Sequence, residues 1–403
     1  MFKRSLKSYS FIINIVFFTI LLIVSTYLLN RAFIFSSAIG ILFVAITYGK
    51  IQFSKKAILI TLFSITTTLI SLIVFVKSDS SLGRLLIYKI TSRMLSENFL
   101  SGIGLGNFKR DFGLYQARYF EEGHYTTKEF LLAGNGYYAF NDYWQIIVET
   151  GLIGILILPF ALFIVIKIIY IRFRKNSEDP LFIFFMTCLL VLSIAAFFTH
   201  VFMHKSAQIV TFLSLCYIFT PENRLFRKMY IFFIAFFAIL FCFEEIRNRQ
   251  RSKELSRAKE LSDAGYISES IQNYEDLYIK MNNEVAFLRP YAQVLTGKNN
   301  LKMRLVILKK IQRKWTDNLL YLNIAQTYES LGLHENAEKA FLKSVNIVPN
   351  RFVPKYALYN FYMKNKNFEK ASHWRKIILT MPVKVPSDHV NFIKLRVKTN
   401  NSN

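Results

Sequence analysis

The residues best suited to chemistry on a charged substrate are two arginines that each lie beside a hydrophobic run. Arg31 follows the first apolar run of the chain, and Arg84 follows the third. A guanidinium group offers several N–H donors in a fixed plane, so it can bind an anionic group and neutralise its charge. The ordinary alternative for either arginine is a side chain that extends to the bilayer surface, or a charge in a loop.

A glycine-rich segment follows Arg84 and reads Gly-Ile-Gly-Leu-Gly-Asn-Phe over residues 102–108. Its three glycines, Gly102, Gly104 and Gly106, allow positive φ angles and close approach of another group, and such a turn can present amide N–H donors to an anion. It is not a dinucleotide fingerprint, because no strand precedes it and the spacing differs. A tight turn that binds nothing fits the same residues.

Few side chains between the third and fourth apolar runs can act as a base. Asp142 and His124 can accept a proton, although Asp142 also suits a helix surface and His124 a solvated loop. Five aromatic residues precede the fourth apolar run: Tyr137, Tyr138, Phe140, Tyr143 and Trp144. They suit either an interfacial aromatic belt or a wall on which sugars stack. The three cysteines all lie in apolar segments, so the sequence predicts neither a disulfide framework nor a metal site.

The composition indicates which elements position these residues. With 53% hydrophobic residues and 40 phenylalanines in 403 residues, the chain is typical of a membrane protein, and the apolar runs lie before residue 244. We predict seven spans of about the length that a bilayer requires. They are Phe11–Leu29, Ala32–Tyr48, Ala57–Val76, Ile146–Ile171, Leu181–Phe198, Ser206–Thr220 and Met229–Phe243. The first run lacks a small-residue cleavage site, so we expect a retained span rather than a signal peptide.

The basic residues predict the orientation of the spans. The formal net charge is +25, and the Lys and Arg residues of the first half gather in short loops on one side of the spans. This pattern places that side in the cytoplasm and favours membrane orientation over nucleic-acid binding. Residues 77–145 and the chain after Phe243 then face the periplasm of a bacterial inner membrane. The basic stretch Arg247–Lys253 opposes this assignment, but long domains cross a membrane largely regardless of charge.

Segment 77–145 is too long to be a mere connector. An apolar stripe in Arg84–Glu97 predicts an amphipathic helix, with Lys89 and Arg93 on another face. Such a helix either lies on the membrane surface or packs on the spans. The segment therefore has the features of a structured functional loop.

Three short motifs keep a recognisable order and spacing. The run GRLLIYKITSRMLSENFLSGIGLGNF begins next to Arg84 and ends in the glycine turn, with Asn98-Phe99 where an Asn-Pro is usual. In AFNDYWQIIVETGLIG, nine residues separate Asn141 from Gly151, and Gly154 follows. Asn30-Arg31-Ala32 opens the second span. Together, over Asn30–Ile171, these motifs resemble those of the O-antigen ligase and polymerase family.

The resemblance implies a glycan transfer from a polyprenyl-pyrophosphate carrier to an acceptor hydroxyl on lipid A core, on a protein or on another glycan, without a metal or a nucleotide cofactor. It implies Arg31, Arg84 and Asn141 as catalytic residues. The three glycines of the turn and Trp144 are the candidates for substrate binding. Family members carry a proton-accepting histidine before the asparagine, and this chain has Phe140 there. Phenylalanine cannot accept a proton, so another base serves, or the acceptor needs no strong base, or the transfer activity is lost.

Two further features bear on the assignment. Family members usually carry more spans, and the additional ones would precede Phe11. From about Arg251 the pattern changes to amphipathic helices with a repeat near 34 residues, which is typical of tetratricopeptide repeats. The clearest copy is Asn318–Arg351. Stacked repeats form a concave surface that usually binds a partner, and a basic excess here favours an acidic partner or anionic lipid, or simply keeps the domain soluble.

We therefore predict an all-α fold, a polytopic transmembrane bundle followed by a tetratricopeptide-like solenoid. The predicted parts are three spans in 1–76, a periplasmic loop in 77–145, four spans in 146–243 and the repeats in 251–385. The leading functional hypothesis is an O-antigen ligase-like glycan transferase. A polysaccharide polymerase is a variant of it, and a non-catalytic membrane scaffold that acts through the repeats is the alternative from a different class.

Overall fold

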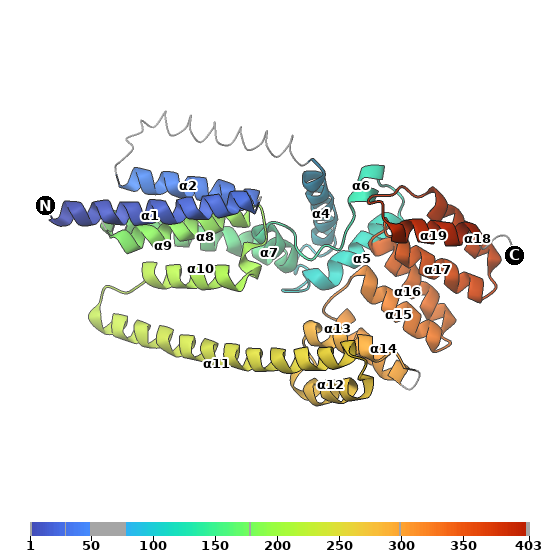
Figure 1. Cartoon of the computed structure of the whole chain (residues 1–403). Helices are drawn as coiled ribbons and strands as arrows, with labels where there is room; N and C mark the ends of the chain where they lie inside the picture. The colour runs from blue at the N-terminus through green and yellow to red at the C-terminus, as the bar shows by residue number, and fades with distance from the viewer. Residues whose placement is uncertain (1, 29, 49–77, 177–178, 298–299, 400–403) are drawn as a thin grey trace. The chain divides into compact units, whose positions relative to one another are not determined.

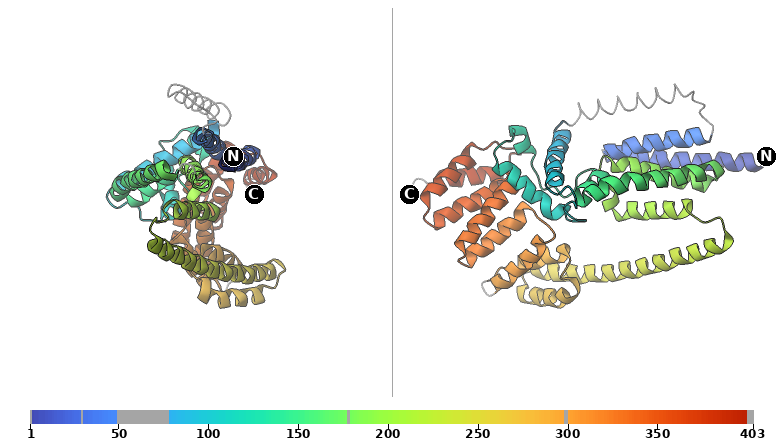
Figure 2. Two further views of the ribbon diagram at one scale, coloured as in Figure 1. Left: turned by 90° about the vertical axis from the view of Figure 1, so that its left-hand side faces the viewer. Right: turned by 180° about the vertical axis from the view of Figure 1, so that it is seen from behind.

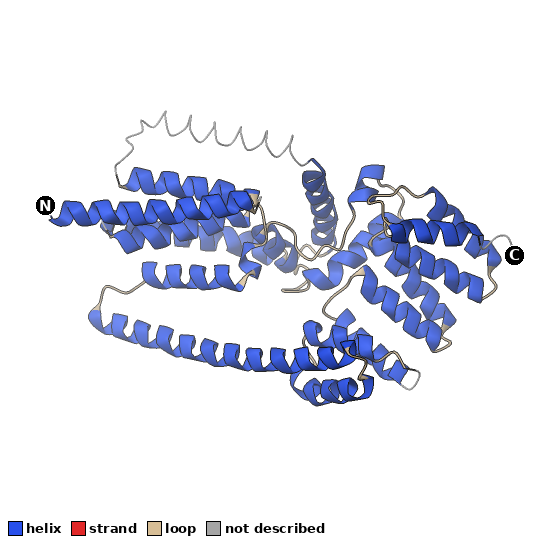
Figure 3. Ribbon diagram, viewed as in Figure 1, coloured by secondary structure: helices blue, strands red, loops and turns tan. Residues whose placement is uncertain are grey.

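The computed structural model describes residues 2–28, 30–48, 78–176, 179–297 and 300–399. Every regular element in these ranges is a helix (Figure 3), which confirms the predicted all-helical class for them. Contacts divide the chain into two compact units that interleave along the sequence. Unit 1 comprises 1–84, 98–102 and 138–240, and unit 2 comprises 85–97, 103–137 and 241–403.

Unit 1 holds the apolar helices. Helices α1, α2, α9 and α10 lie side by side in it, and α7 precedes α8 (Figures 1 and 2). Their bounds are α1 Phe2–Tyr27, α2 Arg31–Thr47, α7 Asp142–Thr150, α8 Leu152–Asn176, α9 Pro180–Ala196, the 3₁₀ helix η1 Val201–Met203 and α10 Lys205–Ile218. Helix α11, Arg224–Asp263, begins in this unit.

The apolar helices carry large hydrophobic side chains on their outer surfaces. Ile13 of α1 is 66% exposed, Leu156 of α8 is 63% exposed and Phe232 of α11 is 68% exposed. Helices α1, α8 and α11 are long and apolar enough to cross a membrane, and α2, α9 and α10 are shorter apolar helices. Exposed apolar surface on this scale is stable in lipid rather than in water.

Two of the predicted spans differ in the structure, and a third lies outside the described residues. The fourth span, predicted as Ile146–Ile171, is two helices that meet at Gly151, where φ is +64°. The seventh, predicted as Met229–Phe243, is part of a 40-residue helix that continues to Asp263. The residues after 243 are good helix formers, so a change from apolar to charged residues does not end the helix. The third predicted span, Ala57–Val76, cannot be compared.

Small residues allow close packing within unit 1. A Cβ atom at Gly40 would lie 2.7 Å from Val191 Cγ2, so α2 approaches α9 more closely than any larger residue would permit. At the end of the bundle where α2 begins, a small-residue cluster includes Ala32, Ala195 and Val201, with Tyr143 and Phe202 packed against it. Small residues at helix contacts are typical of packing inside membranes. This cluster joins the starts of α2 and α7 to the end of α9.

Unit 2 contains the C-terminal helices together with most of the predicted loop. Its helices are α4 Ser78–Glu97, whose first residues belong to unit 1, α5 Phe108–Glu121, α6 Thr127–Leu132, α12 Ile267–Met281, α13 Val285–Val294, α14 Leu301–Gln312, α15 Asn318–Ser330, α16 His334–Ile347, α17 Phe352–Lys364, α18 Phe368–Thr380 and α19 Asp388–Thr399. From α12 onward, successive helices pack on their neighbours around one core. The last helix extends this core beyond residue 385, where the sequence pattern ended.

The loop does not form a body of its own. Helix α5 packs on α16, and the Gln116 side-chain amide donates hydrogen bonds to the carbonyls of Ile347 and Gly134. Asn350, 7% exposed, donates to the carbonyls of Phe130, Leu131 and Ala133 at 2.8–3.0 Å. The chain between the apolar runs is therefore folded onto the C-terminal helices.

Helix α4 is tied to the same part of the chain by its charged face. Lys89 Nζ lies 3.0 Å from Glu129 Oε1, and Arg93 lies 2.6 Å from Glu122. Its apolar residues Leu86, Ile90 and Met94 are buried, as an amphipathic helix that packs inside the protein requires.

Candidate functional site

The two glycine motifs of the sequence meet in unit 1. A Cβ atom at Gly102 would lie 2.4 Å from the carbonyl oxygen of Glu149, and one at Gly151 would lie 2.4 Å from the amide nitrogen of Gly102. The Leu152 amide donates to the carbonyl of Phe99 at 2.7 Å, which closes the contact. Both glycines have positive φ. The turn after α4 and the junction of α7 and α8 therefore form one backbone-to-backbone contact.

Arg84 lies over Phe140, the residue directly before Asn141. Its guanidinium carbon is 5.4 Å from the centre of the Phe140 ring. Phe140 has a φ of +55°, which is unusual for a bulky residue and is a conformation that histidine adopts more readily. Strained backbone of this kind is concentrated at functional positions. The structure thus brings together the arginine and the second motif, which the sequence separates by more than fifty residues.

Asn141 and Asp142 start helix α7. The Asn141 side chain accepts a hydrogen bond from the Trp144 amide at 3.0 Å, so it caps the helix. Asp142 is buried and accepts the Phe202 amide at 2.9 Å. Burial raises the pKa of Asp142, and the backbone amides of Phe202 and Val201 partly oppose that shift. Asp142 therefore fixes the turn between α9 and α10 against α7.

That turn carries a histidine which the sequence analysis did not single out. The His200 ring stacks on the Tyr138 ring with centroids 4.2 Å apart and nearly parallel planes. It also meets the Phe140 ring edge to face, at 5.5 Å and 79°. His204 lies 5.3 Å from His200, centroid to centroid. In the sequence, these two histidines are marked only by their position just after an apolar run. They lie far along the chain from every motif, so no motif pointed to them.

Arg31 begins α2 at the same end of the bundle. Ala32, Val201 and Tyr143 pack together in one core. These residues directly follow Arg31, His200 and Asp142 in the sequence, so the core brings those three positions near one another. One guanidinium nitrogen of Arg31 is buried without a hydrogen-bond partner. The structure therefore gathers Arg31, Arg84, Asn141 and Asp142 at or around one end of unit 1.

Three candidates lie in unit 2. His124 is exposed, and its carbonyl accepts the Tyr119 hydroxyl at 3.3 Å. Gly104 and Gly106 have positive φ, and a Cβ at Gly104 would lie 2.5 Å from the Asn107 side chain, whereas one at Gly106 would meet open space. These glycines belong to a turn that Asn107 closes locally through its bond to the Ile103 carbonyl.

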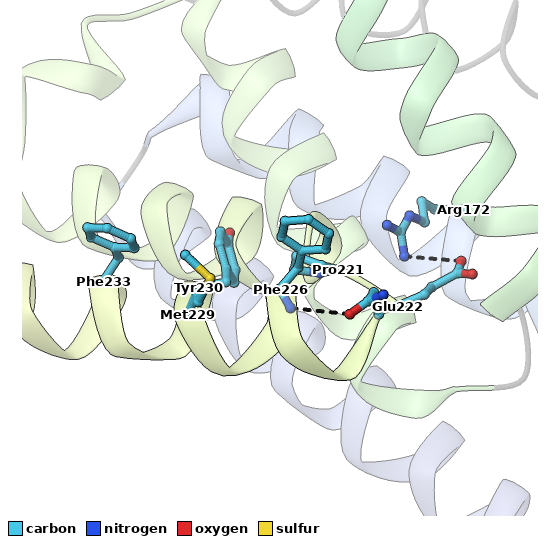
Figure 4. Close-up of a pocket in the computed structure, with 8 residues that line it drawn as sticks. Arg172, Pro221, Glu222, Phe226, Met229, Tyr230 and Phe233 are labelled. Atoms are coloured by element: carbon cyan, nitrogen blue, oxygen red, sulfur yellow. Dashed lines mark hydrogen bonds and ion pairs between the residues drawn. The ribbon is translucent and has the colours of Figure 1, made fainter.

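A surface pocket lies at the other end of unit 1, beside the C-terminal end of α8. Arg172 and Lys175 pair with Glu222 at 3.5 and 3.2 Å. Figure 4 shows the Arg172–Glu222 pair and the side chains of Phe226 and Tyr230 of α11, which line the pocket. Arg172, which lines the pocket, follows Gly151 by 21 residues along α8, so the pocket is roughly 30 Å from Gly151. It is therefore separate from the candidate site. Among the residues that the structure describes, no group of three or more His, Cys, Asp and Glu side chains could hold a metal ion.

The fold and the site together define a helical membrane protein with arginines, an asparagine and aromatic rings at one end of its apolar bundle. Residues 7–159 match the family model of O-antigen ligase. The matched range includes Arg31, Arg84 and Asn141 and ends before His200 and the C-terminal helices. This similarity supports a membrane glycan transferase of that general kind, with a lipid-linked glycan and an acceptor as its substrates. No curated protein matches the chain.

Proposed function

We propose that the protein transfers a glycan from a polyprenyl-pyrophosphate carrier to an acceptor hydroxyl, as an O-antigen ligase does, on lipid A core or on a protein. The observation that carries the proposal is the position of Arg84, 5.4 Å from the ring at the family's histidine position, within a match to that family. A pyrophosphate that leaves with its lipid develops negative charge, and a fixed guanidinium neutralises it. Arg31 is the second such group.

The orientation proposed for this reaction places the site on the periplasmic side of a bacterial inner membrane. The basic residues Arg172, Arg174 and Lys175 end α8, and Arg224 begins α11. Gly151 directly precedes α8, at its opposite end from Arg172, Arg174 and Lys175. Ala32, next to Arg31, packs with Ala195 at the end of α9 that lies far from these charges along the chain. Because basic residues favour the cytoplasmic side, the candidate site would face outward, at the depth of a lipid headgroup.

The C-terminal helices are proposed to be tetratricopeptide-like repeats. The pair α15 and α16 matches the residues of the clearest sequence copy, 318–351. Part of the surface of these helices already binds the chain's own loop through Gln116 and Asn350. Any acceptor or assembly partner would therefore use the remaining surface.

Replacement of the arginine tests the proposal. In source cells whose chromosomal copy encodes Arg84→Ala, attachment of the surface glycan should fall to background, while Arg118→Ala, a change at an exposed arginine of α5, should leave it unchanged. Protein level is checked by immunoblot. Normal attachment with Arg84→Ala at normal protein level would contradict glycan transfer by this chain. That result would favour the second candidate, a membrane scaffold, for which Phe140 is the supporting observation.

A further inference from the structure

The space beside Phe140 is occupied by an imidazole from a distant part of the chain. His200 is half-buried, and its ring meets the Phe140 ring edge to face with ring centres 5.5 Å apart. A histidine side chain at position 140 would lie beside Arg84, as the Phe140 ring does. The Phe140 ring also contacts His200. A proton acceptor therefore lies one aromatic ring away from the position where the family places its own.

The His200 ring is held in a defined orientation. Tyr138 stacks flat on it, with an angle of 4° between the planes, and Phe140 meets it at 79°. The turn that carries His200 is fixed by the hydrogen bond from the Phe202 amide to buried Asp142. Rings packed on two sides and a pinned backbone reduce the conformations available to the side chain, which is a requirement for a preorganised catalytic group.

We propose that His200 is the general base of the transfer reaction, in place of the histidine that Phe140 replaces. The inference rests on the proposed function. In the step, the acceptor hydroxyl oxygen forms a bond to the anomeric carbon of the glycan, and its proton moves to an imidazole nitrogen of His200. The bond from that carbon to the pyrophosphate oxygen breaks, and the lipid pyrophosphate leaves with the electron pair beside Arg84.

A second histidine gives the proton a route away from the site. His204 is exposed, and its ring lies 5.3 Å from that of His200. After each transfer the imidazolium of His200 must lose a proton before the next cycle, and an exposed imidazole at this distance can pass it to water through one bridging molecule. His204 is therefore a proton carrier in this scheme, and its loss should slow turnover less than the loss of His200.

The primary test compares His200→Gln with His389→Gln, which removes an exposed imidazole of α19. In source cells and in membrane vesicles prepared from them, His200→Gln should lower the rate of glycan attachment by about 10²- to 10⁴-fold, the usual contribution of a general base. His389→Gln should leave the rate unchanged. A rate within threefold of wild type for His200→Gln would overturn the proposal.

A rescue experiment separates catalysis from a structural role of the stacked ring. The double variant Phe140→His/His200→Gln should transfer glycan at least tenfold faster than His200→Gln, because the φ of +55° at position 140 suits histidine. A merely structural His200 would not be replaced by a base at 140. Failure of the double variant to gain activity, although it folds, would overturn the assignment.

Binding of a carrier mimic distinguishes failure of this inference from failure of the proposed function. Purified full chain in detergent is heated with farnesyl pyrophosphate, and the shift of its melting temperature reports binding. His200→Gln should keep the shift, and Arg84→Ala should lose it. Loss of transfer in Arg84→Ala with normal transfer in His200→Gln overturns only the role of His200, whereas normal transfer in Arg84→Ala overturns the proposed function. If His200→Gln loses the shift, the double variant decides: a recovered shift without recovered transfer overturns the role of His200.

Discussion

Gly102 leaves no room for a side chain at Gly151, and the backbone of Glu149 and Thr150, just before Gly151, leaves none at Gly102. Both glycines have a positive φ, of +65° and +64°, and the Phe99 carbonyl that accepts the Leu152 amide lies in the same contact. Because Arg84 begins the segment that ends at Gly102, and Asn141 caps the helix that ends at Gly151, this contact couples the positions of the two motifs. Its integrity is therefore a condition for the site.

Gly102→Ala should destabilise unit 1 severely. The methyl group would lie 2.4 Å from the Glu149 carbonyl, and an alanine at positive φ costs about 1–2 kcal/mol before any clash is counted. We expect loss of most folded chain from detergent extracts, measured by size-exclusion chromatography. Gly106→Ala is the matched control. Gly106 also has a positive φ, of +75°, but an added methyl group there would meet open space, so the variant should lose only the stability that the backbone strain costs. Equal behaviour of the two variants would contradict the importance of the contact.

Asp142 is predicted to act through its hydrogen bond rather than through its charge. Asp142→Asn keeps an oxygen for the Phe202 amide, whereas Asp142→Ala leaves that amide without its acceptor and should cost about 1–3 kcal/mol. Because burial raises the pKa of Asp142, the wild-type chain should lose stability as pH rises from the ordinary aspartate pKa through the raised one. Asp142→Asn should lack this loss. Melting temperatures of the three proteins between pH 4 and 8 provide the measurement.

The sequence predicted those features that depend on local residues. Apolar runs placed α2, α9 and α10 within a few residues of their observed bounds, because a span must be apolar along its whole length. It did not predict the break at Gly151, since the apolar pattern runs across it. The long α11 was also missed, because composition changes at residue 243 while helix propensity does not.

The site itself was predicted only in part. Arg31, Arg84 and Asn141 were found because they belong to motifs with a fixed spacing. His200 was missed because its partners, Tyr138 and Phe140, lie about sixty residues earlier, and only tertiary packing brings the rings together. The docking of the loop on the C-terminal helices was missed for the same reason. Asn350 follows α16 and has no sequence feature that connects it to Ala133.

Lys355 should make the stability of unit 2 depend on pH. Its side chain is 4% exposed and donates to the Pro349 carbonyl, and burial lowers its pKa to about 7. The unfolded chain therefore binds more protons between pH 7 and the ordinary lysine pKa of about 10.4, so stability should rise with pH in that window, by up to about 1.4 kcal/mol per pH unit. Lys355→Met should abolish the rise, and Lys343→Met, at an exposed lysine of α16, should not. A rise of equal slope in Lys355→Met would contradict the assignment.

Asn350 is predicted to hold the loop onto the C-terminal helices. Its amide donates to the carbonyls of Phe130, Leu131 and Ala133 at 2.8–3.0 Å. Asn350→Ala removes the donor from buried carbonyls and should cost about 1–3 kcal/mol, so the loop should open more often. Limited trypsin cleavage after Lys128 should then become several-fold faster. Asn346→Ala, which removes only an exposed hydrogen bond to Glu121, should change the cleavage rate little, because such surface bonds contribute about 0.5 kcal/mol or less. If both variants are cleaved at the wild-type rate, the loop is held by its apolar contacts, and the carbonyl bonds of Asn350 are dispensable.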